Sequence, residues 1–336
     1  MAADSAKATA WAIFDRIVAD AAPAGVHSNP WRRGPGEQPV YTPDFAVLQR
    51  LLGVPLYLAA DTNTGVPALA LDVWLSYELR RAGFEPDAVW PRATSPRIMP
   101  RAIASLLVEL PRHERELLQR RLFGKTAMKG VVGSTANILG KNYIKQVDVV
   151  MSDWDTGPEL LVSTKRMDSS FGKNAANRVE ESYGDVKNLR LRHPLAALGF
   201  VYGLRSTILV EEPNKAEWLI DLLQKLGNED DAYHAVALVM IDYDGEIGPA
   251  ADDVDDGDDP LVAAGVTPAQ IDSEQGTLDY ANVEEALAEL PEVTIRHDTV
   301  PDALQPSVFL AKMVGRVLDV TPVARHREAR SRRKNV

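Results

Sequence analysis

An aspartate and a lysine occupy matching positions on two strands that the sequence predicts to be neighbours. The first strand covers residues 143–151 and contains Asp148, and the second covers 159–165 and ends at Lys165. A Trp-Asp-Thr-Gly-Pro turn separates them, which is typical of a hairpin. Because side chains alternate faces along a strand, pairing of the two strands brings Asp148 and Lys165 together at one end of the hairpin.

A carboxylate beside an ammonium group has a desolvation cost that a metal, a phosphate or hydrogen bonds must offset. Metal-assisted phosphodiester cleavage provides such compensation, because the carboxylate binds Mg²⁺ while the lysine orients a water or stabilises the charged phosphate. An ordinary cross-strand ion pair on a solvated face is the alternative. The pattern by itself leaves both interpretations open.

The order of Asp148, a turn and then Ser163-Thr164-Lys165 resembles the signature of the PD-(D/E)XK nuclease superfamily, to which many type II restriction endonucleases belong. The resemblance spans roughly residues 70–210. It implies an α/β fold in which a central mixed sheet carries the αβββαβ core of restriction endonucleases. It also implies Mg²⁺-dependent hydrolysis of double-stranded DNA. Two features depart from the family pattern: Ser163 replaces the usual Glu or Asp, and no proline precedes Asp148.

The resemblance assigns roles to these residues. Asp148 is the expected metal ligand, Lys165 the cation that positions the attacking water, and Ser163 a helper acting through water. A hydroxyl is a poorer Mg²⁺ ligand than a carboxylate, so a second acid is needed. Because the family often supplies a Glu from the helix before the first strand, we expect Glu78, near the end of a helix over 67–82, to be that ligand.

Glu78 also has a structural interpretation. A carboxylate at a helix C-terminus is disfavoured by ~0.3–1 kcal/mol, which either a bound cation or a neighbouring basic side chain offsets. The basic candidates are Arg80, Arg81 and Lys125. If Glu78 is not the second acid, the remaining candidates are Glu159, Asp168, Glu180 and Glu181.

A helix predicted over residues 171–190 has an unusual polar stripe, because asparagine is a poor helix former. Asparagine pairs bidentately with adenine and arginine with guanine, and both bind phosphates. We therefore predict DNA contacts here, with a solvated polar face as the alternative. The predicted contacts are Asn174, Asn177, Arg178 and Asn188, with Arg190 and Arg192 just beyond.

Composition limits the chemistry. The 336 residues include no cysteine, which excludes disulfides, thiolate zinc sites and cysteine nucleophiles. The net charge is −11, yet residues 112–205 contain sixteen Lys and Arg against ten acids, which is compatible with a positive DNA-binding region in an acidic protein. No apolar run approaches the length of a membrane span and no signal peptide is evident. We therefore expect a cytoplasmic protein with no membrane partner.

Four segments are predicted along the chain. They are an N-terminal helical and irregular arm (1–66), a nuclease-like core (67–245), a C-terminal extension with an acidic loop (246–322) and a disordered basic tail (323–336). Within the core, the apolar run over 195–204 is predicted to be a helix. Since cleavage of both strands commonly uses two subunits, we expect a homodimer. Two alternatives keep the fold: an inactive nucleic-acid-binding protein, and a nuclease acting on RNA or branched DNA.

Overall fold

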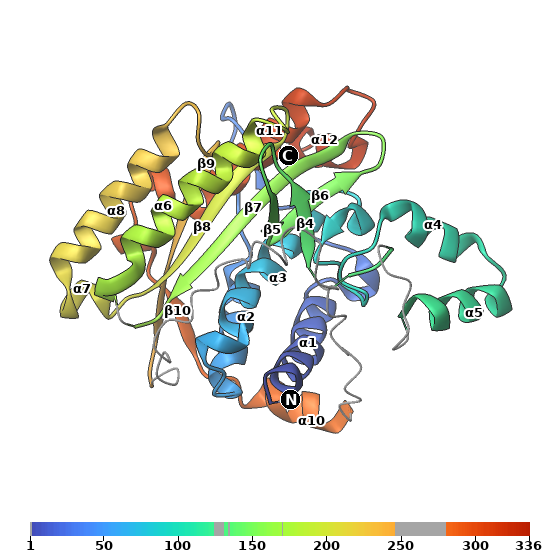
Figure 1. Cartoon of the computed structure of the whole chain (residues 1–336), viewed down its shortest axis with the longest axis horizontal. Helices are drawn as coiled ribbons and strands as arrows, with labels where there is room; N and C mark the ends of the chain where they lie inside the picture. The colour runs from blue at the N-terminus through green and yellow to red at the C-terminus, as the bar shows by residue number, and fades with distance from the viewer. Residues whose placement is uncertain (1, 124–130, 134, 170, 246–279) are drawn as a thin grey trace.

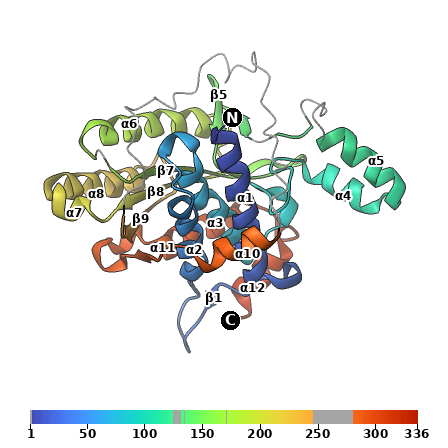
Figure 2. The same cartoon turned by 90° about the horizontal axis from the view of Figure 1, so that it is seen from below.

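The computed structural model describes the chain except for residues 1, 124–130, 134, 170 and 246–279. A mixed sheet of six strands, in the order β10-β9-β8-β7-β6-β3, forms its centre. Helices lie on both faces of the sheet (Figures 1 and 2). The predicted α/β class with a central mixed sheet is confirmed.

The main sheet has an antiparallel part and a parallel part. β3, β6 and β7 pair antiparallel, β7, β8 and β9 pair parallel, and β10 is antiparallel to β9. Its strands are β3 (Val89–Trp90), β6 (Val149–Asp153), β7 (Gly157–Met167), β8 (Ala197–Arg205), β9 (Ala235–Tyr243) and β10 (Val293–Ile295). Two separate pairs are β1 (Trp31–Arg32) with β2 (Val40–Tyr41), and β4 (Ala136–Leu139) with β5 (Ile144–Val147).

Two hydrophobic cores cover the two faces of the main sheet. One face packs against α1 (Ala2–Ala21), α2 (Phe45–Tyr57), α3 (Val66–Arg81), α10 (Tyr280–Ala288), α11 (Pro306–Val320) and α12 (Arg327–Lys334). The other packs against α6 (Phe171–Arg190), α7 (Ile208–Glu211) and α8 (Pro213–Asn228). Single 3₁₀ turns are η1 (Pro23–Gly25), η2 (Thr62–Thr64), η3 (Pro86–Ala88), η4 (His297–Thr299) and η5 (Asp302–Leu304).

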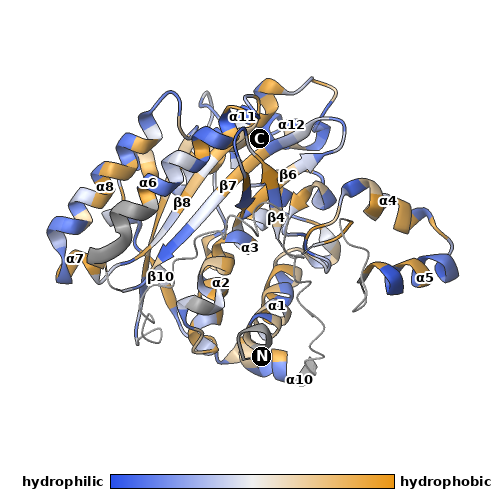
Figure 3. Ribbon diagram, viewed as in Figure 1, coloured by the Kyte–Doolittle hydropathy of each residue, from blue (hydrophilic) through white to orange (hydrophobic). Residues whose placement is uncertain are grey.

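A helical hairpin of α4 (Arg101–Glu109) and α5 (Arg112–Phe123) projects beyond the β3 edge of the sheet (Figure 1). It has a small core of its own, and α5 is mostly hydrophilic (Figure 3). This hairpin and the β4–β5 pair are both inserted between β3 and β6 in the chain. Without these insertions, the chain order is α3, β3, β6, β7, α6, β8.

The run over 195–204 is strand β8, so the predicted helix is wrong. Parallel strands between two helical layers are buried on both faces, which makes their sequences continuously apolar. Phe200 accordingly belongs to the α6–α8 core and Val201 to the opposite one. Gly199 permits the close approach of α11, because a Cβ there would lie 2.8 Å from Phe309 and Met313.

The basic tail is also ordered, contrary to the prediction, because its arginines bind helix ends. Arg330 donates to the carbonyls of Leu318 (2.6 Å) and Thr321 (2.9 Å) after α11, and Arg332 donates to that of Arg81 (2.8 Å) at the end of α3. Cations at these positions satisfy unpaired carbonyls and complement the helix dipole. The tail therefore forms α12 and closes the α3–α11 side of the fold.

The predicted C-terminal extension shares the main sheet and its core, through β10 and α11. Its acidic loop lies within residues 246–279, outside the described residues. Among the helices that the structure describes, none combines the length and the apolar character needed to cross a bilayer.

The stability of the fold is expected to fall in acid partly because of His234. Its Nδ1 accepts a hydrogen bond from the Leu198 N–H (3.0 Å), which requires a neutral ring. Burial, assisted by the charges of Arg190 and Arg316, lowers the pKa of His234 from 6.5 to about 4. The unfolded chain binds the proton more tightly, so stability present above pH 6.5 is lost as the pH falls toward 4.

The measurement is urea unfolding of the wild type and His234→Gln at pH 7.5, 5.5 and 4.5. The stability gap between the two proteins should shrink at the lower pH values, since glutamine does not titrate. A gap that is constant with pH would contradict the assignment. Other histidines contribute equally to both proteins and cancel in the difference.

Candidate active site

Asp148 lies where the chain passes from one sheet to another. Val147 ends β5 in the small β4–β5 pair, and Val149 begins β6 in the main sheet. β6 pairs Val149 with Val162 of β7, so Asp148 lies level with the segment Ser163-Thr164-Lys165. The Thr164 N–H donates to Asp148 Oδ2 at 2.7 Å. The structure thus brings Asp148 and the end of β7 together, as the sequence pattern predicts.

A second carboxylate comes from α3, but it belongs to Asp72. The Thr164 hydroxyl donates to Asp72 Oδ1 at 2.6 Å, so two atoms of one residue hold both carboxylates. Asp72 is only 8% exposed. Burial, followed by the negative charge of Asp148, raises the pKa of Asp72 well above its usual value, against the opposing effects of the Thr164 hydrogen bond, Lys7 and Lys165. Two acids at this spacing in a low dielectric are a place where a cation is stabilising.

Ser163 and Lys165 lie on the other face of β7, because side chains alternate along a strand. The Ser163 side chain lies near enough to the Tyr233 hydroxyl to act on its pKa, and that hydroxyl donates to the Ser182 carbonyl at 3.0 Å. Ser163 therefore faces the α6 side of the fold. Lys165 is half-buried on this face, opposite the face from which Thr164 reaches Asp72, and its positive charge still acts to lower the pKa of Asp72.

Thr164 should be required for the position of Asp72. Thr164→Val keeps the shape and the backbone N–H but removes the hydroxyl donor, so we expect a loss of about 2 kcal/mol in the free energy of unfolding. Thr164→Ser keeps the donor and is the matched control. Urea unfolding at neutral pH distinguishes them, and equal stability of the valine and serine variants would show that the hydroxyl bond is unimportant.

Glu78, the predicted second acid, is instead a structural residue. Its side chain is fully buried and accepts bonds from Arg81 Nη1 (3.0 and 2.8 Å), the Tyr41 hydroxyl (3.0 Å) and the Asp44 N–H (2.6 Å). It follows Asp72 by six residues in α3, which is about 9 Å along the axis and about 240° around it. Glu78 therefore lies on another side of the helix. Its ion pair with Arg81 agrees with the alternative, structural interpretation of this residue.

Glu78→Gln is expected to reduce stability and to leave Mg²⁺ affinity unchanged. It breaks a buried ion pair and leaves Arg81 without its anion, at a cost of about 3 kcal/mol. Asp72→Asn is the matched comparison on the same helix and should instead weaken Mg²⁺ binding. Urea unfolding and calorimetric titration with Mg²⁺ separate the two effects. Weakened Mg²⁺ binding in folded Glu78→Gln would restore Glu78 as a ligand.

The remaining candidates for the second acid also lie away from Asp148 or have other partners. Glu159 faces His326 (2.9 Å) near the start of β7, about 20 Å along the strand from Lys165. Asp168 accepts bonds from Arg166 (2.8 Å) and the Tyr243 hydroxyl (2.8 Å). Glu180 and Glu181 are exposed on α6. Among the described residues, no group of three or more acidic or histidine side chains forms a metal cluster, so the Asp72–Asp148 pair is the candidate.

The predicted DNA contacts on α6 fall into two groups. The side chains of Asn174, Asn177 and Arg178 lie outside the described residues. Asn188 was predicted wrongly, because its side chain is 2% exposed and bonds the backbone of Asn142 and Tyr143.

The two arginines beyond the stripe also separate. Arg190 donates to the Ala232 carbonyl (2.8 Å), whereas Arg192 is exposed. Of the six predicted contacts, Arg192 is the one whose described side chain stands in solvent.

Asp72 was missed by the sequence reasoning, although a signal existed. It is an isolated acid in the apolar run Ala-Leu-Ala-Leu-Asp-Val-Trp-Leu. A charged residue in such a run is buried with the run, and a buried acid needs a partner. The resemblance to the nuclease family directed attention to a Glu and so to position 78.

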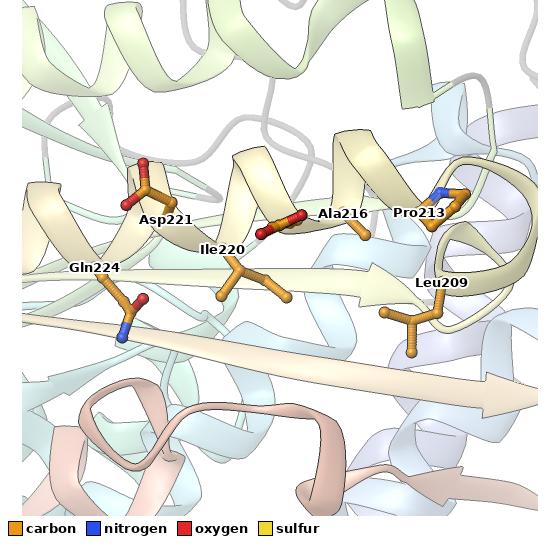
Figure 4. Close-up of a pocket in the computed structure, with 7 residues that line it drawn as sticks. Leu209, Pro213, Ala216, Ile220, Asp221 and Gln224 are labelled. Carbon is orange, nitrogen blue, oxygen red and sulfur yellow. The ribbon is translucent and has the colours of Figure 1, made fainter.

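A hollow on α8 lies outside the candidate active site. It is lined by Leu209, Pro213, Ala216, Glu217, Ile220, Asp221 and Gln224 (Figure 4). Its acid Asp221 is paired with Lys225 at 2.5 Å. The hollow is shallow and mostly apolar, and we assign it no chemistry.

Comparison with known proteins adds no relative. No protein-family model, no curated protein and no solved structure matches the chain.

Proposed function

We propose that this protein is a Mg²⁺-dependent endonuclease that hydrolyses phosphodiester bonds of double-stranded DNA, in the manner of type II restriction enzymes. One observation carries the proposal: Thr164 holds the carboxylates of Asp72 and Asp148 at 2.6 and 2.7 Å, and Lys165 follows directly. The chain order α3, β3, β6, β7, α6, β8 is the αβββαβ order of the PD-(D/E)XK superfamily and supports the same conclusion.

The donor set suits magnesium. Mg²⁺ binds anionic oxygen, commonly one or two protein carboxylates with waters and substrate phosphate completing the shell. Asp72 and Asp148 supply two carboxylates at one place, and their mutual repulsion raises the Asp72 pKa in the absence of a cation. When bound, the ion supplies Lewis-acid activation of the phosphodiester and of a water.

The protein's own groups have separate tasks in this reaction. Asp148 and Asp72 would hold the ion, and the buried Thr164 fixes the position of both carboxylates through its N–H and its hydroxyl. Lys165 contributes a positive charge where the phosphate gains negative charge, which stabilises the transition state more than the bound substrate. Ser163 lies near Tyr233 and has no direct task at the metal.

The alternative is a nucleic-acid-binding protein on an inactive nuclease core. Ser163 favours it, because the position that usually carries an acid is occupied by a hydroxyl that lies near Tyr233. Such a protein would bind DNA with the same surface but would not cleave it. Asp72 is the argument against it, since α3 supplies a second carboxylate without Ser163.

The deciding experiment is incubation of purified protein with supercoiled plasmid in Mg²⁺ and in EDTA. Nicked and linear products that require Mg²⁺ and disappear in Asp148→Asn support the proposal. Binding without cleavage in the wild type selects the inactive protein. RNA and branched DNA are tested in parallel, and cleavage confined to them selects a nuclease acting on those substrates.

Because cleavage of both strands commonly uses two subunits, we also propose that the protein is a homodimer, which sedimentation tests. We also propose a cytoplasmic location.

A further inference from the structure

β4 and β5 form a two-stranded antiparallel ribbon with distinct faces. Ala136 and Val147 pair across the ribbon and are buried on its back, against the α6 side of the fold. Asn137 and Gln146 also pair across the ribbon, but both are exposed on its front. Two side-chain amides therefore stand opposite each other on the open face.

The front of the ribbon leads directly to the candidate active site. Gln146 precedes Asp148 by two residues, which is at most about 7 Å along the chain. A molecule in contact with Gln146 is thus next to the carboxylate that binds the metal in the proposed reaction. The ribbon lies on the same side of the main sheet as α6 (Figure 2).

The ribbon is anchored from behind. Asn188 of α6 accepts from the Asn142 N–H (2.8 Å) and donates to the Tyr143 carbonyl (3.0 Å), and Asp185 pairs with Lys145 (3.0 Å). Gly140 is needed at the tip, because a Cβ there would lie 2.1 Å from the Asn188 amide. The ribbon backbone that carries the exposed amides is therefore held in place, which lowers the entropic cost of binding.

Positive charge lies at the tip end of the ribbon. Lys141 is exposed at the tip of the ribbon. Arg192 is exposed in the loop after α6, and His193 of that loop contacts the Leu139 carbonyl at 2.9 Å. The cations and the neutral amides of the ribbon match a ligand that has an anionic backbone and carries hydrogen-bonding groups inside its grooves. Duplex DNA has this arrangement.

We propose that the β4–β5 ribbon enters the major groove of duplex DNA beside the scissile phosphate, and that Asn137 and Gln146 read base edges there. The proposal rests on the nuclease function and names the element that gives it sequence preference. A two-stranded ribbon fits the major groove, and an amide side chain pairs bidentately with adenine N6 and N7. The deep, narrow major groove of A-form RNA excludes such a ribbon.

The test uses Asn137→Ala, Gln146→Ala and the double variant, with Gln224→Ala on α8 as the matched amide control. Sequencing the ends of DNA cut by each protein gives its base preference, and duplexes selected from a random pool in Ca²⁺ give the same information for a protein that binds without cutting. The ribbon variants should lose discrimination at one or two adjacent base pairs by about 5- to 150-fold. Their Mg²⁺ affinity should equal that of the wild type and of Gln224→Ala.

Unchanged base preference in the double variant overturns the ribbon proposal, even where cleavage itself is intact. The ribbon proposal is also overturned if the wild type shows no base preference, or if it acts on RNA and neither Asn137→Ala nor Gln146→Ala changes that activity. Failure of the nuclease function gives a different result. Asp148→Asn then has no effect on cutting, while selection from the random pool still measures the base preference that the ribbon gives to binding. A wild type that binds no duplex overturns both proposals.

The absence of cysteine allows a direct check. Gln146→Cys and Gln224→Cys each carry one thiol, which forms a disulfide only with a thiol-modified base that it reaches. Cross-linking to a major-groove thiol at Gln146→Cys but not at Gln224→Cys is the expected result. Cross-linking at neither position, with duplex binding retained, contradicts insertion of the ribbon.

Discussion

Asp148→Asn is expected to lose Mg²⁺-dependent cleavage by about 10³-fold or more, because one of the two carboxylates of the metal site is removed. The side chain keeps its volume, and its amide oxygen still accepts the Thr164 N–H. The metal-free protein should be at least as stable as the wild type, since a charge that raises the Asp72 pKa is gone. Loss of Mg²⁺ affinity without loss of stability is thus the signature of a functional acid.

Plasmid cleavage, calorimetric titration with Mg²⁺ and urea unfolding give the three readouts. Asp153→Asn is the matched control, because Asp153 ends β6, the strand that follows Asp148, and pairs with Arg101 at 3.0 Å. It should cut plasmid like the wild type. If Asp148→Asn binds Mg²⁺ and cuts at the wild-type rate while losing stability, Asp148 is a structural residue.

Lys165→Ala is expected to lose cleavage by a similar factor, about 10³-fold, while DNA binding survives. The ammonium group acts on charge that develops during the reaction, so its removal affects the rate more than the bound substrate. Mg²⁺ affinity should stay the same or rise, because the Lys165 charge opposes that of a bound cation near Asp72. This combination differs from that of Asp148→Asn, which loses the metal.

The measurement is single-turnover cleavage with saturating Mg²⁺, together with duplex binding in Ca²⁺. Lys215→Ala on α8 is the control, since Lys215 is a lysine that is paired with Glu212. Substantial residual cleavage in Lys165→Ala would mean that Lys165 forms an ordinary cross-strand ion pair. The nuclease assignment would then lose Lys165 as a catalytic residue.

Local patterning in the sequence determined the α/β class and the β6–β7 hairpin. Alternation and a turn with Gly157 at positive φ (70°) are local signals, and they placed Asp148 opposite the end of β7. The apolar stripes of α8 and α11 are local signals of the same kind, because an amphipathic helix needs only one buried stripe. The segment 195–204 was misread because a continuously apolar run has no period, and only its place between β7 and β9 makes it a strand.

Tertiary structure alone decided which acid joins Asp148. Asp72 and Glu78 lie in one helix, and their local sequences do not say which side of α3 faces β7. The packing of α3 on the sheet turns Asp72 toward Thr164 and Glu78 toward Arg81. The same holds for the tail, whose arginines are solvated in isolation and become ordered only where α3 and α11 present free carbonyls. A sequence specifies the donors and acceptors, but the rotation of one element against another determines which of them meet.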